Sequence, residues 1–143
     1  MMTDVGILPT PDRDSAPYWA ALANGRLEIQ QCDECGHWTW PPRPICSHCQ
    51  SERLTWRAVA GTGEVHSWVV VHRSTFPGLA PLVPYTLLLV RLDEQGDILI
   101  PGRFVSDVAV HQGLLVRAAP VKVADDIGDI RWEAAATTRT PRT

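Results

Sequence analysis

Two Cys-x2-Cys pairs, separated by ten residues, most strongly limit what this chain of 143 residues can fold into. A two-residue gap lets both sulfurs of a pair face one ion, and two such pairs complete a tetrahedral site. Gly36 follows the first pair and accepts the positive φ of a tight turn, whereas Gln50 holds the equivalent position after the second. The spacing therefore predicts a metal-binding ribbon, with all four cysteines of the chain as its ligands: Cys32, Cys35, Cys46 and Cys49.

The predicted metal is zinc in a structural role. Four thiolates suit zinc or a rubredoxin-like iron, and the short gap between the pairs favours zinc over an electron-carrying iron site. Four protein ligands leave no position for water or substrate, so the site is not expected to be catalytic. Metal binding would supply the folding free energy that so small a ribbon cannot draw from its own core. His37 and His48 adjoin the cysteines and are interpreted as surface residues.

The composition disfavours nucleic-acid binding, because proteins of that class usually carry a basic surface that neutralises phosphates. The formal net charge is −3, and Lys122 is the single lysine. We expect neither a secretory signal nor a membrane span, because the sequence shows no basic start before an apolar run and no long apolar run. We therefore expect a cytoplasmic protein, in which paired cysteines are more often metal ligands than disulfides.

Changes in composition divide the chain into four segments. We expect a flexible lead over 1–14 and a disordered tail over 134–143. Residues 15–60 are expected to hold a helix and the zinc ribbon, and residues 61–133 a barrel. The Gly-Thr-Gly stretch at 61–63 marks the boundary between the two modules.

The stretch SAPYWAALANG predicts a short helix before the ribbon. Ser15 is expected to cap its N-terminus, Pro17 suits its first turn, and Gly25 ends it. A helix this short is marginal alone and has to dock on another surface. Tyr18 and Trp19 lie on its apolar side, and we weigh two roles for them: internal packing, or a patch that faces a partner.

After Glu64 the pattern is almost entirely that of β-strands separated by turn residues. Residues 93–96 predict a hairpin turn, and the prolines within 79–84 predict an irregular loop. Pro101-Gly102 predicts a bulge or sharp bend of the kind found where a small barrel closes. Short strands with bends favour a mainly β fold with a small antiparallel OB-fold barrel, and a two-sheet sandwich is the alternative.

Over about residues 15–125, the chain resembles a bacterial and archaeal family of zinc-ribbon plus OB-fold proteins linked to acyl-CoA metabolism, long catalogued as a domain of unknown function. The resemblance rests on the aromatic helix before the ribbon, the PPR motif at 41–43, Trp56, the Gly-x-Gly boundary and the strand start at Pro84-Tyr85. It implies an N-terminal helix or helical hairpin, a rubredoxin-like zinc ribbon and a C-terminal OB-fold barrel.

The same resemblance implies a function as a non-catalytic partner subunit. Relatives act beside thiolase-like enzymes, including aldolases and lipid-transfer-type thiolases, or beside hydratases, and they handle acyl-CoA thioesters. Degradation of lipids or steroid side chains is the expected setting. A ribbon/OB nucleic-acid-binding module is the alternative, since both folds often serve that end.

The sequence offers a weak case for catalysis by this chain itself. His66 and His72 are six residues apart in one expected strand, so alternation would place both on one face. Ser67, Ser74 or Asp107 could in principle join them in a Ser/His/Asp group, but no Gly-x-Ser-x-Gly elbow is present. Two outward-facing polar positions are the simpler interpretation, and we predict no catalytic residues.

Binding of acyl-CoA would need cations for the phosphates and an apolar slot for the rest of the molecule. Arginines are the candidates by residue type, and Arg73 is favoured because it ends a strand just before the irregular loop. The set is Arg73, Arg43 and Arg103, with Arg91 also considered. The aromatic residues are a separate question, because a small ribbon cannot bury the four of six tryptophans that fall in or beside it: Trp19, Trp38, Trp40 and Trp56.

Overall fold

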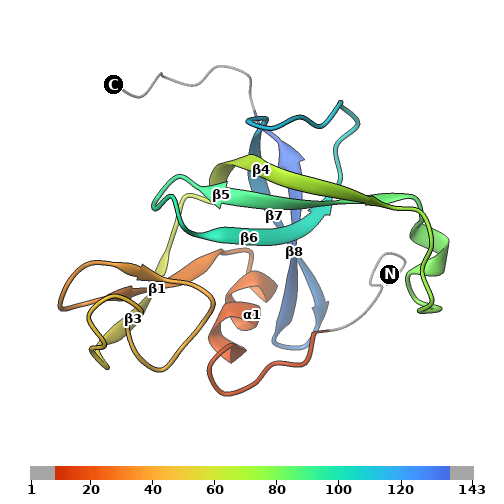
Figure 1. The fold of residues 1–143 in the computed structure, drawn as a ribbon. Helices are drawn as coiled ribbons and strands as arrows, with labels where there is room; N and C mark the ends of the chain where they lie inside the picture. Colours follow the sequence, from red (N-terminus) through yellow and green to blue (C-terminus); the bar gives the residue numbers. More distant parts are fainter. Residues whose placement is uncertain (1–8, 136–143) are drawn as a thin grey trace.

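The computed structural model describes residues 9–135, which form one short helix, a three-stranded sheet and a closed barrel (Figure 1). The sheet has the order β2-β1-β3 and is built from β1 (Glu28–Cys32), β2 (Trp38–Thr39) and β3 (Leu54–Ala58). The barrel has the order β4-β5-β6-β8-β7 and is built from β4 (Thr62–Val71), β5 (Tyr85–Leu92), β6 (Leu99–Phe104), β7 (Leu115–Ala124) and β8 (Ile127–Ala134). The mainly β fold with an OB-fold barrel is confirmed, and the sandwich alternative is wrong.

The barrel closes where β6 and β8 pair in parallel, at Arg103↔Arg131 and Phe104↔Trp132. All of its other strand pairs are antiparallel. Trp132 fills the interior at this point and is fully buried. A Cβ atom on Gly102 would lie 2.6 Å from the Trp132 indole, so this glycine makes room for the ring.

The predicted bulge at Pro101-Gly102 is wrong, because β6 runs through both residues in regular register with β5. The proline is tolerated there because β8 pairs with β6 only from Arg103 onward. Bulges occur instead between Val65 and Ser67 in β4 and between Lys122 and Ala124 in β7.

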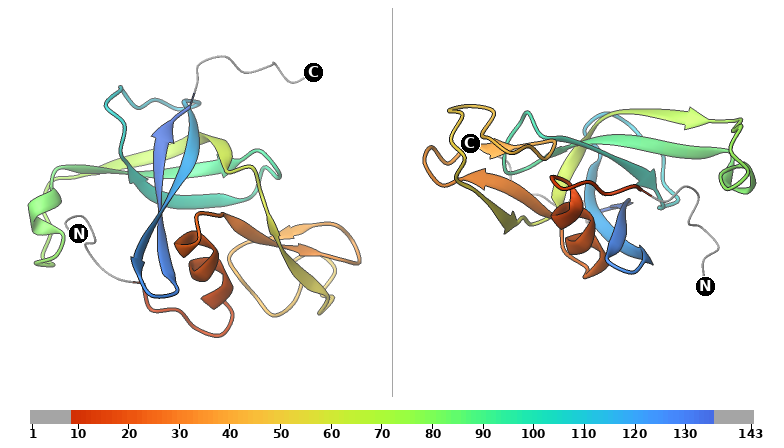
Figure 2. Two further views of the ribbon diagram at one scale, coloured as in Figure 1. Left: turned by 180° about the vertical axis from the view of Figure 1, so that it is seen from behind. Right: turned by 90° about the horizontal axis from the view of Figure 1, so that it is seen from below.

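Helix α1 (Ala16–Ala23) lies between the three-stranded sheet and the hairpin of β7 and β8 (Figures 1 and 2). Its backbone rests directly on β8, because a Cβ on Gly128 would lie 2.2 Å from the Ala23 nitrogen. The helix therefore docks on the rest of the chain, as its short length requires.

The N-terminus of α1 is held differently from the prediction. Ser15 occupies the N-cap position, but its hydroxyl caps no helical N–H group. Instead, the Ser15 N–H donates to the Asp12 carboxylate (2.8 Å), and the Asp12 N–H donates to the Ser15 hydroxyl (3.1 Å). Part of the expected lead, residues 9–14, is thus described and includes this turn, whereas residues 1–8 lie outside the described residues.

Two further segments refine the expectations. A short 3-10 helix, η1 (Ala80–Leu82), forms within the loop that was predicted to be irregular. In the expected tail, Ala134 still belongs to β8, the Ala135 N–H donates to the Leu115 carbonyl (2.9 Å), and residues 136–143 lie outside the described residues. Between residues 9 and 135, no helix is long and apolar enough to span a bilayer.

Candidate metal centre and its support on the barrel

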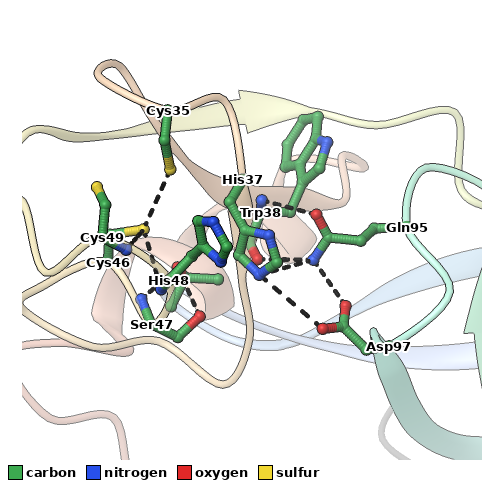
Figure 3. A network of polar contacts seen from close by, with 10 residues as sticks. Cys35, His37, Trp38, Cys46, Ser47, His48, Cys49, Gln95 and Asp97 are labelled. Atoms are coloured by element: carbon green, nitrogen blue, oxygen red, sulfur yellow. Dashed lines mark hydrogen bonds and ion pairs between the residues drawn. The ribbon is translucent and has the colours of Figure 1, made fainter.

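The four predicted ligands converge on one point. Among residues 9–135, they form the one cluster of at least three His, Cys, Asp or Glu side chains close enough to hold a metal ion. All four sulfurs lie within 4.8 Å of one another. The Sγ atoms of Cys32 and Cys49 are 3.6 Å apart. Those of Cys35 and Cys46 are 3.7 Å apart (Figure 3). Tetrahedral zinc with Zn–S bonds of about 2.3 Å separates its sulfurs by about 3.8 Å. The sulfur geometry and the all-thiol donor set therefore fit a structural zinc ion.

The two cysteine pairs fold into similar tight turns. The Gly36 N–H donates to the Cys32 carbonyl and the Gln50 N–H donates to the Cys46 carbonyl, each at 3.0 Å. Gly36 has φ 79° and Gln50 has φ 66°, so the second turn places a side-chain-bearing residue in the left-handed region. The equivalence of these two positions, inferred from the spacing, is confirmed by the backbone.

Backbone N–H groups prepare the inner thiols for metal binding. The N–H of Cys35 lies 3.5 Å from the Cys32 sulfur and lowers the pKa of that thiol. Burial raises the pKa of Cys46, but the N–H groups of Cys49 (3.4 Å) and His48 (3.3 Å), together with contacts to the Cys35 and Cys49 sulfurs, lower this pKa to about 6. Because zinc binds the thiolate, these contacts favour the metal-bound form.

His37 and His48 lie beside the cluster but do not join it. Their rings stack on each other, with centroids 4.9 Å apart and planes at 23°. His37 faces the barrel, with its Nε2 atom 3.4 Å from the Gln95 Nε2 atom and 3.9 Å from a carboxylate oxygen of Asp97 (Figure 3). The two histidines thus occupy the seam between the ribbon and the turn that joins β5 to β6.

Gln95, in that turn, fastens the ribbon to the barrel. The Trp38 N–H donates to Gln95 Oε1 at 3.0 Å, and Gln95 Nε2 donates to the Trp38 carbonyl at 2.8 Å (Figure 3). The side-chain amide pairs with the backbone of β2 as a neighbouring strand would. Nearby, the Trp40 indole N–H donates to the Leu99 carbonyl at 3.0 Å. These contacts fix the metal centre relative to the barrel.

Replacing Gln95 with alanine should lower the free energy of unfolding of the zinc-loaded protein by about 1–3 kcal/mol, because both hydrogen bonds to the Trp38 backbone are lost together with the contacts to His37 and Asp97. The zinc content should not change, because Gln95 touches no ligand sulfur. Urea denaturation of the zinc-saturated protein measures the effect.

Gln112→Ala is the matched control, since Gln112 is exposed and makes one longer hydrogen bond, 3.4 Å, to the His66 carbonyl. Its effect should stay below about 0.5 kcal/mol. Equal effects of the two substitutions would show that Gln95 does not fasten the ribbon.

The tryptophans of the ribbon region cement it to the helix and barrel. All four pack partly buried against the common core: Trp19, Trp38, Trp40 and Trp56. Tyr18 is the hub of this packing, with its ring centroid 4.9 Å from that of Trp19 and 4.8 Å from that of Trp40. Its side chain is 3% exposed. Burial, together with the negative charge of Asp129, raises the pKa of Tyr18 and keeps it neutral.

Tyr18 is therefore an internal packing residue, which corrects the alternative that its ring faces a partner. Trp19 lies nearer the surface, and its indole N–H donates to the Ser15 hydroxyl at 3.3 Å. It borders an apolar pocket of about 270 Å³ lined by Ser15, Tyr18, Trp19, Trp40, Pro41, Pro42, Pro101, Asp129 and Ile130. A role for Trp19 in partner binding stays a prediction.

The structure does not gather the candidate CoA-binding arginines into one site. Arg43 is exposed in the ribbon, where Gln30 bonds both its N–H (2.8 Å) and its carbonyl (2.9 Å). Arg73 lies in the segment that joins β4 to η1, and this segment is at the end of the molecule opposite to the ribbon (Figure 1). Arg103 lines a pocket of about 260 Å³ with Leu79, Leu82, Tyr85, Leu87, Pro101, Gly102, Asp129, Ile130 and Arg131. Arg91 instead contacts His66 Nδ1 (2.9 Å) and Glu64 (3.7 Å).

The expectation that His66 and His72 share one face of a regular strand fails. His66 is the extra residue of the β4 bulge, since Val65 pairs with Val90 and Ser67 pairs with Leu89. The bulge interrupts the alternation on which the expectation rested. The His66 ring contacts the Arg91 guanidinium, at 2.9 Å from Nδ1, and among the described residues it pairs with neither a serine nor an aspartate.

Three side chains were not singled out by the sequence. Gln95 carried no signal beyond its place in a predicted turn, because its partner, Trp38, is distant in the chain. Gln30 looked like an ordinary polar strand residue but is buried and holds the backbone of the ribbon loop. In the sequence Trp68 is one residue of an apolar run, but in the structure its side chain is exposed on β4.

Residues 19–55 match the domain family described as "ChsH2, rubredoxin-like zinc ribbon domain", and residues 56–121 match "ChsH2, C-terminal OB-fold domain". A probable enoyl-CoA hydratase alpha subunit of Thermomonospora curvata is 40% identical over 88 residues, which are 60% of this chain. This chain spans 26% of the length of that relative. A "DUF35 domain-containing scaffold protein" of Pyrococcus furiosus is 32% identical over 108 residues, 76% of this chain and 79% of that protein.

Solved structures agree with these matches. A chain in the structure described as "Ltp2-ChsH2(DUF35) aldolase" superposes with a TM-score of 0.78 at 29% identity, over 90% of this chain and 99% of that chain. A DUF35 protein of unknown function from Sulfolobus solfataricus shares the fold, with a TM-score of 0.58 at 15% identity and 86% coverage of each chain. The two domain matches and the extent of similarity to the Pyrococcus protein show that this chain belongs to the ChsH2/DUF35 family of zinc-ribbon and OB-fold proteins.

Proposed function

We propose that this chain is a non-catalytic accessory subunit of an acyl-CoA-processing enzyme and binds a thiolase-like or hydratase partner. One observation carries the proposal. This chain superposes on a chain in a structure described as "Ltp2-ChsH2(DUF35) aldolase" and covers 99% of that chain's length. The names of the two sequence relatives, a hydratase alpha subunit and a scaffold protein, favour the same class of role. A closed four-thiol metal centre suits a scaffold, because it has no open position for substrate.

The finer part of the proposal is that the chain helps to bind or channel the acyl-CoA. The pocket beside Arg103 combines this guanidinium with the apolar side chains of Leu82 and Leu87. A cation next to an apolar wall suits a phosphate-bearing ligand with a long uncharged arm. Arg73 and Arg43 lie apart from this pocket, and their contact with the acyl-CoA phosphates stays a prediction from the sequence. Degradation of lipids or steroid side chains, in the reducing cytoplasm, is the proposed setting.

On helix α1, Trp19 is the residue that we propose to contact the partner. This side chain borders the apolar pocket between α1, the ribbon loop and the barrel. Aromatic anchors of this kind contribute strongly to protein–protein interfaces. Tyr18 would act indirectly, by holding the Trp19 ring in place.

Co-expression with thiolase-like and hydratase subunits of the same organism tests the proposed function. Size-exclusion chromatography with light scattering should detect a stable hetero-complex, and the partner's turnover of acyl-CoA should fall at least about tenfold when this chain is omitted. In the complex, Arg103→Gln should raise the KM for acyl-CoA, and Arg53→Gln, on the exposed ribbon surface, should leave it unchanged.

A chain that stays alone with every such subunit would contradict the proposal. A salt-dependent gel shift with single-stranded nucleic acid would then support the alternative, a ribbon/OB nucleic-acid-binding module. The net charge of −3 and the single lysine disfavour that outcome.

A further inference from the structure

The outer half of β4 forms an open strand edge, defined here as residues 67–71. On one side this segment pairs with β5, from Ser67↔Leu89 to Val71↔Tyr85. On the other side β7 pairs with β4 only over Thr62, Gly63 and Glu64. The hairpin of β4 and β5 therefore extends beyond the barrel toward η1 (Figures 1 and 2).

The loop between β6 and β7 covers the edge only up to its beginning. The Gly113 N–H donates to the Val65 carbonyl at 2.9 Å, and the Gln112 side chain reaches the His66 carbonyl at 3.4 Å. Beyond His66, no strand among residues 9–135 pairs with this side of β4. The outward backbone N–H and C=O groups of the open edge are thus available to another strand.

The side chains of the open edge are apolar on both faces. Trp68, Val69 and Val70 are 41%, 57% and 45% exposed. Successive residues of a strand point to opposite faces, so both faces of the sheet are exposed here. Because Val69 pairs with Leu87 and Trp68 pairs with Leu88, their side chains point to opposite sides of the sheet. Exposed edge strands are usually protected by lysine, proline or an inward charge, and residues 67–71 contain none of these. A binding role explains this unprotected edge.

The positive charge at the end of the open edge indicates which kind of strand would pair with it. His72 and Arg73 follow it directly and are exposed. A strand that pairs here meets a cation at this end, which favours an acidic residue at the facing position. Antiparallel self-pairing of the edge about Val69 would instead place His72 of one copy opposite His66 of the other and Arg73 opposite Val65, and neither facing residue is a carboxylate.

We propose that the open edge of β4 is the docking site for an extended segment of the partner enzyme, which adds a strand to the barrel sheet. The segment has apolar side chains on both faces and an acidic residue opposite Arg73. Backbone hydrogen bonds hold it in register, and Trp68, Val69 and Leu87 supply the apolar contacts. This inference rests on the proposed function, because the partner is the acyl-CoA-processing subunit named there.

The test compares two pairs of exposed valines in the complex with the co-expressed thiolase-like or hydratase subunit. Val69→Lys/Val70→Lys places charges on both faces of the open edge. Val105→Lys/Val108→Lys is the matched control on the loop between β6 and β7, where the valines are similarly exposed. The edge variant should bind the partner at least about 30-fold more weakly, and the control variant within about threefold of the unchanged chain.

Amide hydrogen exchange on the unsubstituted chain gives a second readout that does not depend on how the variants fold. Complex formation should slow exchange of alternate amides in residues 67–71 at least about tenfold, as strand pairing buries them. A complex with unchanged affinity in the edge variant and no protection at 67–71 would overturn this docking site and leave the proposed function intact. A dimer of the chain alone that the edge variant abolishes would assign the edge to a second copy. Failure to form any complex would overturn both proposals.

Discussion

Replacing Cys46 with serine should reduce bound zinc from about one ion per chain to nearly none and unfold the ribbon. Cys46 is fully buried, and its sulfur lies 3.7 Å from that of Cys35. A serine hydroxyl does not ionise near neutral pH and cannot replace the thiolate. Structural zinc in small domains contributes about 10–16 kcal/mol of apparent binding free energy near pH 7, and this energy is also folding free energy. The loss therefore exceeds what the small three-stranded sheet can offset.

The zinc content of purified protein and amide exchange in β1 and β3 measure this result. His48→Ala is the matched control, because His48 adjoins Cys46 in sequence and is exposed outside the four-sulfur cluster. It should keep the zinc and leave exchange in β1 unchanged. Full zinc content in Cys46→Ser, or zinc loss in His48→Ala, would show that the ligand set differs from the four cysteines.

The metal centre could be predicted from the sequence because it is local. Two short turns place the sulfurs, and the geometry of each turn follows from hydrogen bonds to the residue four positions earlier, as between Gln50 and Cys46. The positive φ of Gln50 shows that the geometry of the cysteine turn outweighs the conformational preference of the residue at that position. The β-rich pattern likewise indicated the barrel, since alternation and turn residues are also local signals.

The contacts that position the ribbon could not be predicted, because they join residues distant in sequence. Gln95 bonds the backbone of Trp38 from the other module, and the indole N–H of Trp40 reaches Leu99. No periodicity records such pairings. The burial of Tyr18 also depends on Trp40, which approaches only when the ribbon docks on the helix. The bulge at His66 shows the same limit, since register depends on the neighbouring strand.

Replacing Trp132 with alanine should lower the free energy of unfolding of the zinc-loaded protein by about 3–5 kcal/mol. Trp132 is fully buried where β6, β7 and β8 meet, opposite Phe104 and Ala118. Gly102 leaves the space that the indole fills, so its removal opens a cavity that the regular strands around it cannot readily close. Urea denaturation at saturating zinc measures the barrel's contribution while the ribbon stays intact.

Two further substitutions separate cavity formation from other effects of losing an indole. Trp132→Phe should cost clearly less, because it keeps an aromatic ring and removes a buried indole N–H that has no hydrogen-bond partner among the described residues. Trp68→Ala should cost clearly less than Trp132→Ala, because Trp68 is 41% exposed on the open edge of β4 whereas Trp132 is fully buried. If Trp132→Ala and Trp68→Ala destabilised the chain equally, Trp132 would not be the residue that closes the barrel. A Trp68→Ala variant that folds normally but binds the partner weakly would show that Trp68 is buried on complex formation, as docking at the open edge of β4 requires.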